Sequence, residues 1–298
     1  MSRQSSPLFI LALLGGCAST PAPAAEQSTT PPPMAANIEA PPPEPAAAPP
    51  EPAPVITPVD PATAPKPVAL SVPKPIQAIV TAKDRSEADR ALDAGRHPGE
   101  LLTFFDVKPG MKVAELFAGG GYTSELLARA VGKSGVVYGQ NTRRILERFA
   151  EKPWSERLAR PVMKQVVRVD RELDDPLPPE AKGLDAVFSV LIYHDTVWLG
   201  ADRDKLNQAV FAALKPGGVY AIVDHSGRTG SGTTETETLH RIEESAVRAE
   251  IERAGFKLAA EGQFLRNPAD TRDWNDSPLA AAERRGTSDR FVLKFVKP

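Results

Sequence analysis

The sequence predicts one α/β domain whose mostly parallel β-sheet is covered by helices on both faces. Two observations support this prediction. Short apolar runs alternate with helical segments along the C-terminal part of the chain, and these runs are apolar without interruption. Strands that are buried on both faces have this pattern, and alternating βα units form parallel sheets. No helix is expected between the last two strands, so the final strand is predicted to be antiparallel.

The elements begin at about residue 79. Two short helices are expected at 86–94 and 98–105, the second with a proline in its first turn. The predicted strands are 113–115, 136–139, 166–170, 184–192, 219–223, near 256–265 and near 290–296. The predicted helices between them are 123–131, 142–151, 202–214 and 239–254. Ile145, Leu146 and Phe149 are expected on the apolar face of the helix at 142–151.

Composition sets the domain organisation and excludes several kinds of site. The chain has 298 residues, and most of its 31 prolines precede residue 83. Residues 18–78 are rich in proline and alanine, so they are predicted to form a disordered tether before a domain at 79–298. The net charge of −2 gives no electrostatic basis for nucleic-acid binding. A single cysteine excludes an internal disulfide, a four-cysteine zinc site and a cysteine-bound iron–sulfur cluster.

The N-terminus resembles the signal peptide of a bacterial lipoprotein. Arg3 precedes an apolar run at 8–14 that is too short to span a bilayer, and Leu-Gly-Gly-Cys at 14–17 comes next. The resemblance implies cleavage before Cys17 and membrane anchoring through its lipidation. Ala18 is similar to the outer-membrane sorting pattern, which implies a periplasm-facing, outer-membrane protein. The alternative is an ordinary signal peptide with an incidental cysteine.

Polar residues cluster where the predicted strands end. In open parallel sheets, ligands bind beyond the carboxyl ends of the strands, where the strand order switches. The residues there are 115–122, Gln140 and Asn141, Asp170 and Arg171, 193–195, and Asp224 and His225. Their convergence on one edge predicts a binding site, although solvated loop ends would explain any one of them.

Four short motifs follow one another along the chain. They are Val-Ala-Glu-Leu-Phe-Ala-Gly-Gly-Gly-Tyr at 113–122, Val-Tyr-Gly-Gln-Asn at 137–141, Leu-Lys-Pro-Gly-Gly at 214–218 and Ala-Gly-Phe at 254–256. In this order they resemble the class I S-adenosylmethionine (SAM)-dependent methyltransferases, in particular their signal-peptide-bearing branch of predicted methyltransferases. The resemblance covers about residues 84–298. It implies a Rossmann-like, seven-stranded, mostly parallel sheet with an antiparallel last strand, and SAM as the cofactor.

The resemblance also implies roles for individual residues. Glu115 would orient the methionine amine of SAM, Asn141 would take the ribose hydroxyls, and Asp170 and Arg171 would bind the adenine. The remaining residues implied in cofactor binding are Ala118, Gly119, Gly121 and Tyr122. Two positions depart from the family pattern, because Phe117 stands at its first glycine and Asn141 replaces a carboxylate.

Methyl transfer requires alignment and, for an acceptor that carries a proton, a base. His194 and His225 are the candidate catalytic bases, with Asp195 or Asp224 as the orienting partner. Tyr193 is expected to wall the adenine or the acceptor, and His97 to cap a helix or lie on the surface. His240, with Glu243 and Glu244 on the same predicted helix face, could bind a metal, but a solvated charged face is the favoured interpretation, so no metal site is predicted.

These observations support two functions from different classes. The first is a SAM-dependent methyltransferase anchored in the bacterial envelope, acting on a small molecule or an envelope component. The alternative is a catalytically inactive methyltransferase fold that serves as a binding module of the envelope. A misassigned start codon, with a cytosolic domain, is a third interpretation that the position of Cys17 disfavours. The long polar loop at 267–288, which holds Trp274, is expected to form an acceptor lid or a partner surface.

Overall fold

The structure, a computed structural model, describes residues 70–298. The predicted signal peptide, Cys17 and most of the predicted tether lie outside the described residues. Helix α1 (Lys74–Val80) spans the predicted boundary between tether and domain. Among the helices of the described part, none has both the length and the apolar composition that crossing a membrane requires.

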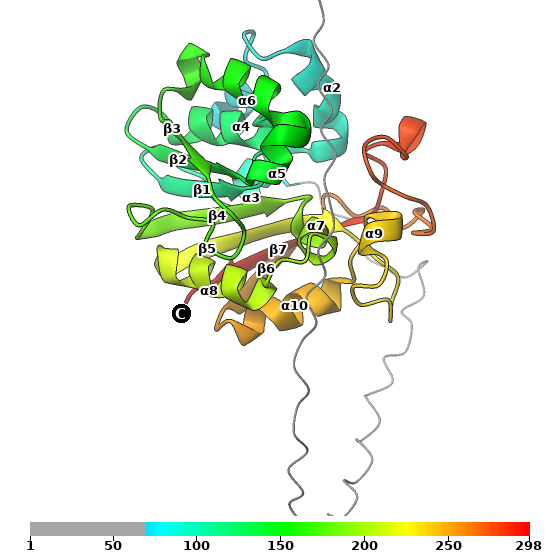
Figure 1. The fold of residues 1–298 in the computed structure, drawn as a ribbon. Coiled ribbons are helices and arrows are strands. Elements are labelled where there is room, and N and C mark those ends of the chain that lie inside the picture. The colour runs from blue at the N-terminus through cyan, green and yellow to red at the C-terminus, as the bar shows by residue number, and fades with distance from the viewer. Residues whose placement is uncertain (1–69) are drawn as a thin grey trace, which may run out of the picture. The chain divides into compact units, whose positions relative to one another are not determined.

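The sheet has seven strands in the order β3-β2-β1-β4-β5-β7-β6 (Figure 1). Their bounds are β1 Lys112–Leu116, β2 Val136–Asn141, β3 Val166–Asp170, β4 Leu184–Val190, β5 Leu214–His225, β6 Lys257–Gly262 and β7 Arg290–Val296. Strands β1 to β5 are parallel, whereas β7 lies antiparallel between β5 and β6. The predicted fold class is therefore confirmed. The strand order switches direction between β1 and β4.

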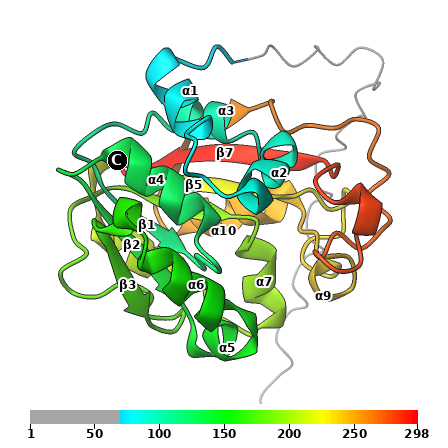
Figure 2. The ribbon, with the colours of Figure 1, turned by 90° about the horizontal axis from the view of Figure 1, so that it is seen from above.

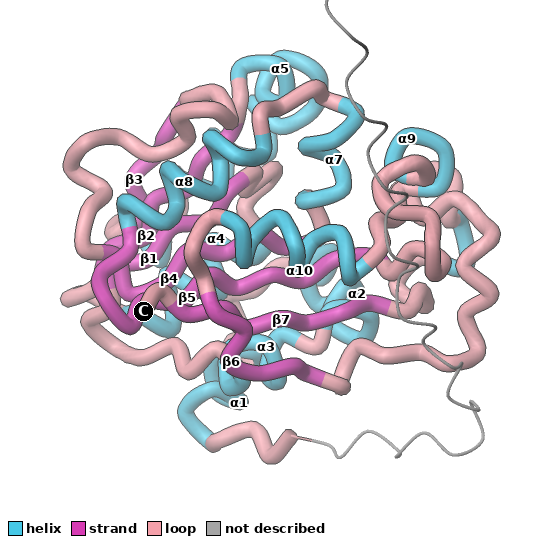
Figure 3. Tube along the Cα trace, turned by 90° about the horizontal axis from the view of Figure 1, so that it is seen from below, coloured by secondary structure: helices cyan, strands magenta, loops and turns pink. Residues whose placement is uncertain are grey.

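Helices cover both faces of this sheet. Helices α1, α4 and α6 lie over one face (Figure 2), and α8 and α10 lie over the other (Figure 3). The remaining helix bounds are α2 Glu87–Arg96, α3 Pro98–Phe104, α4 Tyr122–Val131, α5 Arg143–Ile145, α6 Glu151–Leu158, α7 Tyr193–Trp198, α8 Arg203–Ala213, α9 Thr236–Leu239 and α10 Glu244–Arg253. Because both faces are covered, the central strands are buried and apolar, as the sequence predicts.

The predicted helix at 142–151 is wrong in length and regularity, and of its predicted apolar face Ile145 and Leu146 are buried but Phe149 is not. The segment forms α5, a π-helical turn at Leu146–Ala150, and then α6, which continues to Leu158. A π turn holds an extra residue and rotates the next residues of the chain around the helix axis. Phe149 is therefore 64% exposed, and the fully buried side chain of this region is Trp154.

The predicted helix at 239–254 is also interrupted. Helix α9 ends at Leu239, and α10 begins only at Glu244. Between them His240 has a left-handed backbone with φ of 51°, which no α-helix continues through. The segment returns to the sheet instead, where Ile242 pairs with Ser226 at the end of β5.

Candidate functional site

The loop from β1 to α4 lies at the switch point and bends through left-handed conformations. Phe117, Gly119 and Gly121 have φ of 53°, 55° and 82°. Such a conformation strains a residue that carries a Cβ, so surrounding contacts must hold it. The Phe117 N–H donates to Gln140 Oε1 at 3.0 Å, and the Ala118 N–H donates to the Gln140 carbonyl at 2.8 Å. Phe117 thus adopts a left-handed backbone conformation that glycine takes more readily.

Asn141 holds the same loop from the end of β2. Its Oδ1 accepts the Gly119 N–H at 2.8 Å, and its Nδ2 donates to the Gly119 carbonyl at 3.2 Å. The side chain is fully buried. Both polar atoms of Asn141 are therefore engaged by the loop, whereas the resemblance implies that they bind a ribose.

Two glycines of the loop face different surroundings. A Cβ on Gly121 would overlap the ring of Trp154, which packs beneath the loop. At Gly119, by contrast, the nearest heavy atom to a Cβ would be the Phe117 carbonyl oxygen at 4.0 Å. Gly119 is therefore the part of the loop that a ligand can approach.

Glu115 lies at the end of β1, behind this loop. Its carboxyl group is buried and accepts a hydrogen bond from Ser124 Oγ. Burial raises the pKa of Glu115 to about 7, although hydrogen bonds from Ser124 and Thr123 and the charge of Arg96 oppose the rise. The carboxyl group is therefore poised between its neutral and charged forms near neutral pH.

Arg96 is a cation that the sequence analysis missed. Its guanidinium lies 4.5 Å from the centroid of the Tyr122 ring. Among residues 70–298, no acceptor lies within hydrogen-bonding distance of it, and burial lowers its pKa. With Tyr122, Leu191 and Arg290, it lines a cavity of about 10 Å³ beside the ends of β4 and β5. No motif marks Arg96, because its position depends on how α2 packs against the loop.

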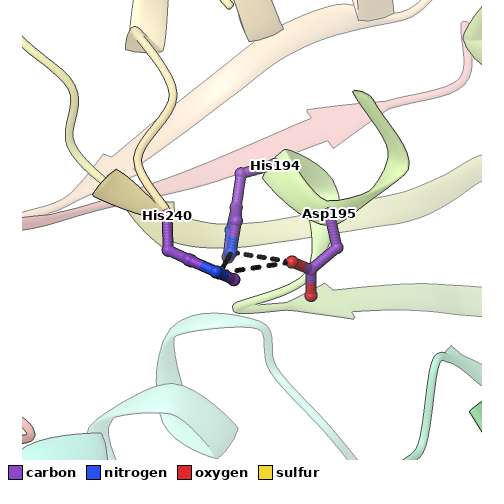
Figure 4. A group of neighbouring side chains, drawn as sticks. All are labelled: His194, Asp195 and His240. Atoms are coloured by element: carbon purple, nitrogen blue, oxygen red, sulfur yellow. Dashed lines mark hydrogen bonds and ion pairs between the residues drawn. The ribbon is translucent and has the colours of Figure 1, made fainter. Parts of the chain in front are cut away.

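The end of β4 brings His194 into a network of acidic groups (Figure 4). His194 is buried, and its Nδ1 lies 2.7 Å from Asp224 Oδ1. Its Nε2 lies 3.1 Å from Asp195 Oδ1 and 3.3 Å from His240 Nδ1. Burial alone would lower the pKa of His194, but the charges of Asp224 and Asp195 and their hydrogen bonds raise it to about 10.

His225 ends β5, and its ring centroid lies 5.5 Å from that of His194. Its Nδ1 lies 3.0 Å from Ser288 Oγ and also contacts Asp276. Burial lowers the pKa of His225, although Asp276 opposes this. The predicted catalytic residues His194, Asp195 and His225 are therefore close together. Asp276, the partner of His225, was missed because it lies 51 residues away in the loop at 267–288.

Two interpretations from the sequence are wrong. Tyr193 does not face a ligand, because it is fully buried and its hydroxyl donates to Glu250 at 2.9 Å. His240 does not share a helix face with Glu243 and Glu244. Its left-handed backbone places it beside His194 and Asp195.

The other predicted residues lie apart from the histidines. Asp170 is exposed at the end of β3 and pairs with Arg168 at 2.9 Å. Arg171 donates to the Asp175 carbonyl at 2.8 Å. The Tyr122 hydroxyl donates to Asp93 at 2.6 Å, and Ala118 is buried in the loop. His97 lies directly before α3, as predicted, but its side chain makes no capping hydrogen bond to the helix backbone and its Nδ1 lies 3.3 Å from Glu100 Oε1.

The loop at 267–288 packs against the end of β5. Arg241 is fully buried, donates to Asp270 at 2.8 Å and lies 4.6 Å from the centroid of the Trp274 ring. Arg272 donates to Asp289 at 2.8 Å. These contacts fix the loop beside His225.

Solved structures that resemble this chain include SAM-dependent methyltransferases. A SAM-dependent methyltransferase from Aquifex aeolicus is 18% identical, with a TM-score of 0.50, and the match covers 75% of this chain and 98% of that one. A putative sarcosine dimethylglycine methyltransferase from Galdieria sulphuraria is 16% identical, with a TM-score of 0.50, and the match covers 76% and 91%. No protein-family model and no curated protein matches the sequence. The strand order, the antiparallel β7 and these neighbours together show that the chain has the fold of class I SAM-dependent methyltransferases.

Proposed function

We propose that this chain is a SAM-dependent methyltransferase that acts in the bacterial envelope on a small molecule or an envelope component. The open backbone of Gly119, at the switch point of a methyltransferase fold, carries the proposal. A loop that lacks side chains where strand meets helix lets a ligand reach the main chain. The fold by itself does not establish an activity.

The residues around the loop fit the parts of SAM. Arg96 is a partly buried cation without an acceptor among the described residues, which suits the carboxylate of the amino-acid end. Glu115 lies behind the loop and would face the ammonium group, whose charge favours the ionised carboxylate. Asp170 offers an exposed carboxylate at the end of β3. Asn141 would act by holding Gly119 in its open conformation.

SAM supplies an electrophilic methyl group on a sulfonium centre. The chain would align an acceptor with that group and remove the proton of the acceptor. His225 is the better placed base, because no residue among 70–298 engages its Nε2. Both ring nitrogens of His194 already face carboxylates.

Calorimetry with SAM and S-adenosylhomocysteine tests the proposal. The full chain with Cys17→Ala is used, because this substitution removes the lipidation site. Binding with Kd below about 100 µM, about 5.5 kcal/mol, is expected. Gly119→Trp should abolish binding. Gly132→Trp is the matched control, since Gly132 has φ of 64°, faces open space and lies at the other end of α4.

The alternative function is a binding module that retains the fold without the cofactor. Two observations favour it, namely the engagement of Asn141 by Gly119 and the small cavity at the switch point. Lack of binding to the wild-type site at millimolar SAM would support this alternative and refute the enzyme.

The envelope location rests on Cys17 and is tested separately. Palmitate labelling of the full chain in a bacterial host should be present in the wild type and absent in Cys17→Ala. Stable membrane anchoring needs at least two lipid signals. Because Cys17→Ala lacks the lipidation site, this variant should also be missing from the membrane fraction. Wild-type protein that takes up no palmitate and stays out of the membrane fraction would refute the lipid anchor.

A further inference from the structure

Three side chains from two separate segments form a compact set of donor atoms (Figure 4). His194 and Asp195 lie in the first turn of α7, and His240 comes directly after α9. One nitrogen of each imidazole and one carboxylate oxygen lie within 4.8 Å of one another. We propose that His194 Nε2, His240 Nδ1 and the Asp195 carboxylate bind a divalent transition-metal ion of the Zn²⁺ type.

The spacing of the three donors matches one face of a metal tetrahedron. The separations are 3.3 Å between the two nitrogens, 3.1 Å from His194 Nε2 to Asp195 Oδ1, and 3.6 Å from His240 Nδ1 to the same oxygen. Bonds of about 2.0–2.1 Å to Zn²⁺ place the ligand atoms of a tetrahedron about 3.3–3.4 Å apart. An ion therefore fits among the three atoms with little movement of the side chains.

A second layer of contacts orients the donors. Asp224 is fully buried, accepts from the His194 backbone N–H at 2.8 Å and lies 2.7 Å from His194 Nδ1. This carboxylate holds a proton on Nδ1, so Nε2, which faces His240 and Asp195, is the nitrogen that gives up its proton when an ion binds. Trp198 Nε1 donates to Asp195 Oδ1 at 2.8 Å. Carboxylates behind ligating histidines and hydrogen bonds to ligating carboxylates are the usual outer partners of a metal site.

Charge and access also suit a cation. Asp195 and Asp224 supply two negative charges, which balance a divalent ion. His194 is buried, but the side chains of Asp195 and His240 are 21% and 23% exposed, so an ion can enter from solvent. His240 is held in a strained left-handed backbone that directs its ring toward the other two groups.

The donor set selects the kind of ion. Two imidazoles and one carboxylate suit zinc and other first-row divalent ions, whereas Mg²⁺ and Ca²⁺ prefer oxygen ligands. Three protein ligands leave one position of a tetrahedron for water or another molecule, as in catalytic rather than structural sites. This inference does not depend on the proposed methyl transfer, because it concerns binding of the ion alone.

Calorimetric titration of the chelator-treated full chain with Zn²⁺, without SAM, tests the site. The protein carries Cys17→Ala and no polyhistidine tag, so neither a thiol nor a tag competes for the ion. His240→Asn removes the imidazole and keeps a residue that tolerates the left-handed backbone. His97→Asn is the matched control, since His97 is left-handed as well, with φ of 45°, and lies outside the cluster.

One equivalent of Zn²⁺ should bind to the wild type and to His97→Asn, and Mg²⁺ should not bind. His240→Asn should weaken Zn²⁺ binding at least about 100-fold, more than the loss of an outer partner, which costs about 10–100-fold. Near-UV circular dichroism checks that each variant is folded, and Co²⁺ absorption gives an independent measure of a tetrahedral site. A wild type that binds no Zn²⁺, or a folded His240→Asn variant that binds as tightly as the wild type, would overturn the proposal.

Discussion

Replacing Glu115 with glutamine isolates the effect of one buried carboxyl group on stability. Burial raises the pKa of Glu115 from 4.5 to about 7 in the folded chain. Below the unfolded-state pKa, both states hold the proton and Glu115 imposes no penalty. As pH rises toward the folded-state pKa, the unfolded state loses the proton first, so the folded state is progressively destabilised. Above about pH 7 the full penalty is present.

The size of this penalty depends on the shift in pKa. One pKa unit corresponds to about 1.4 kcal/mol, so a rise from 4.5 to about 7 corresponds to about 3 kcal/mol. Glutamine has a similar shape and does not ionise between pH 4 and pH 8. Relative to Glu115→Gln, the wild type should therefore lose about 3 kcal/mol of unfolding free energy between these two pH values.

Urea denaturation of both proteins at several pH values measures this difference. The slope of the unfolding free energy against urea concentration must stay constant across the series. Comparing the two proteins cancels the contributions of all other titrating groups. A difference that does not change with pH would refute the reasoning, because it would show that Ser124 and Arg96 stabilise the carboxylate as well as water does. SAM binding should reduce the pH dependence, since its ammonium group favours the charged carboxylate.

Three further predictions test other parts of the structure. Arg96→Gln should weaken SAM binding about 10–100-fold, the loss of a hydrogen bond to a charged group; equal SAM affinity in calorimetry would exclude Arg96 from the site. Gly121→Ala should lower the unfolding free energy by about 1–3 kcal/mol more than Gly132→Ala, since both glycines have positive φ but only Gly121 contacts Trp154. In the same denaturation assay, Trp154→Ala should cost about 3–5 kcal/mol, whereas the exposed Phe149→Ala should be nearly neutral; comparable losses in either pair would contradict this packing of Trp154 beneath the loop.

The strands and the main helices were predictable because their signals are local. Unbroken apolar runs, turn glycines and the Ser86 and Asp202 caps define elements from neighbouring residues alone. The position of the loop at 117–121 was predictable for the same reason. Its backbone was not predictable, because Phe117 adopts a left-handed conformation only through its contacts with Gln140 on β2.

The two errors in the predicted helices share one physical cause. The π turn at Leu146–Ala150 and the left-handed His240 have no strong local signal, so helical periodicity was extended through both. The π turn leaves Phe149 exposed. The left-handed backbone of His240 places its side chain beside His194.

The sequence by itself determined the class of the fold, the order of its elements and the edge of the sheet at which polar groups gather. These depend on periodicity and on the rule that parallel strands end at one edge. Only the tertiary structure decided which of those groups meet. His194 is joined by His240, His225 by Asp276, and the Gly119 loop by Asn141, because packing brings together segments far apart in the chain.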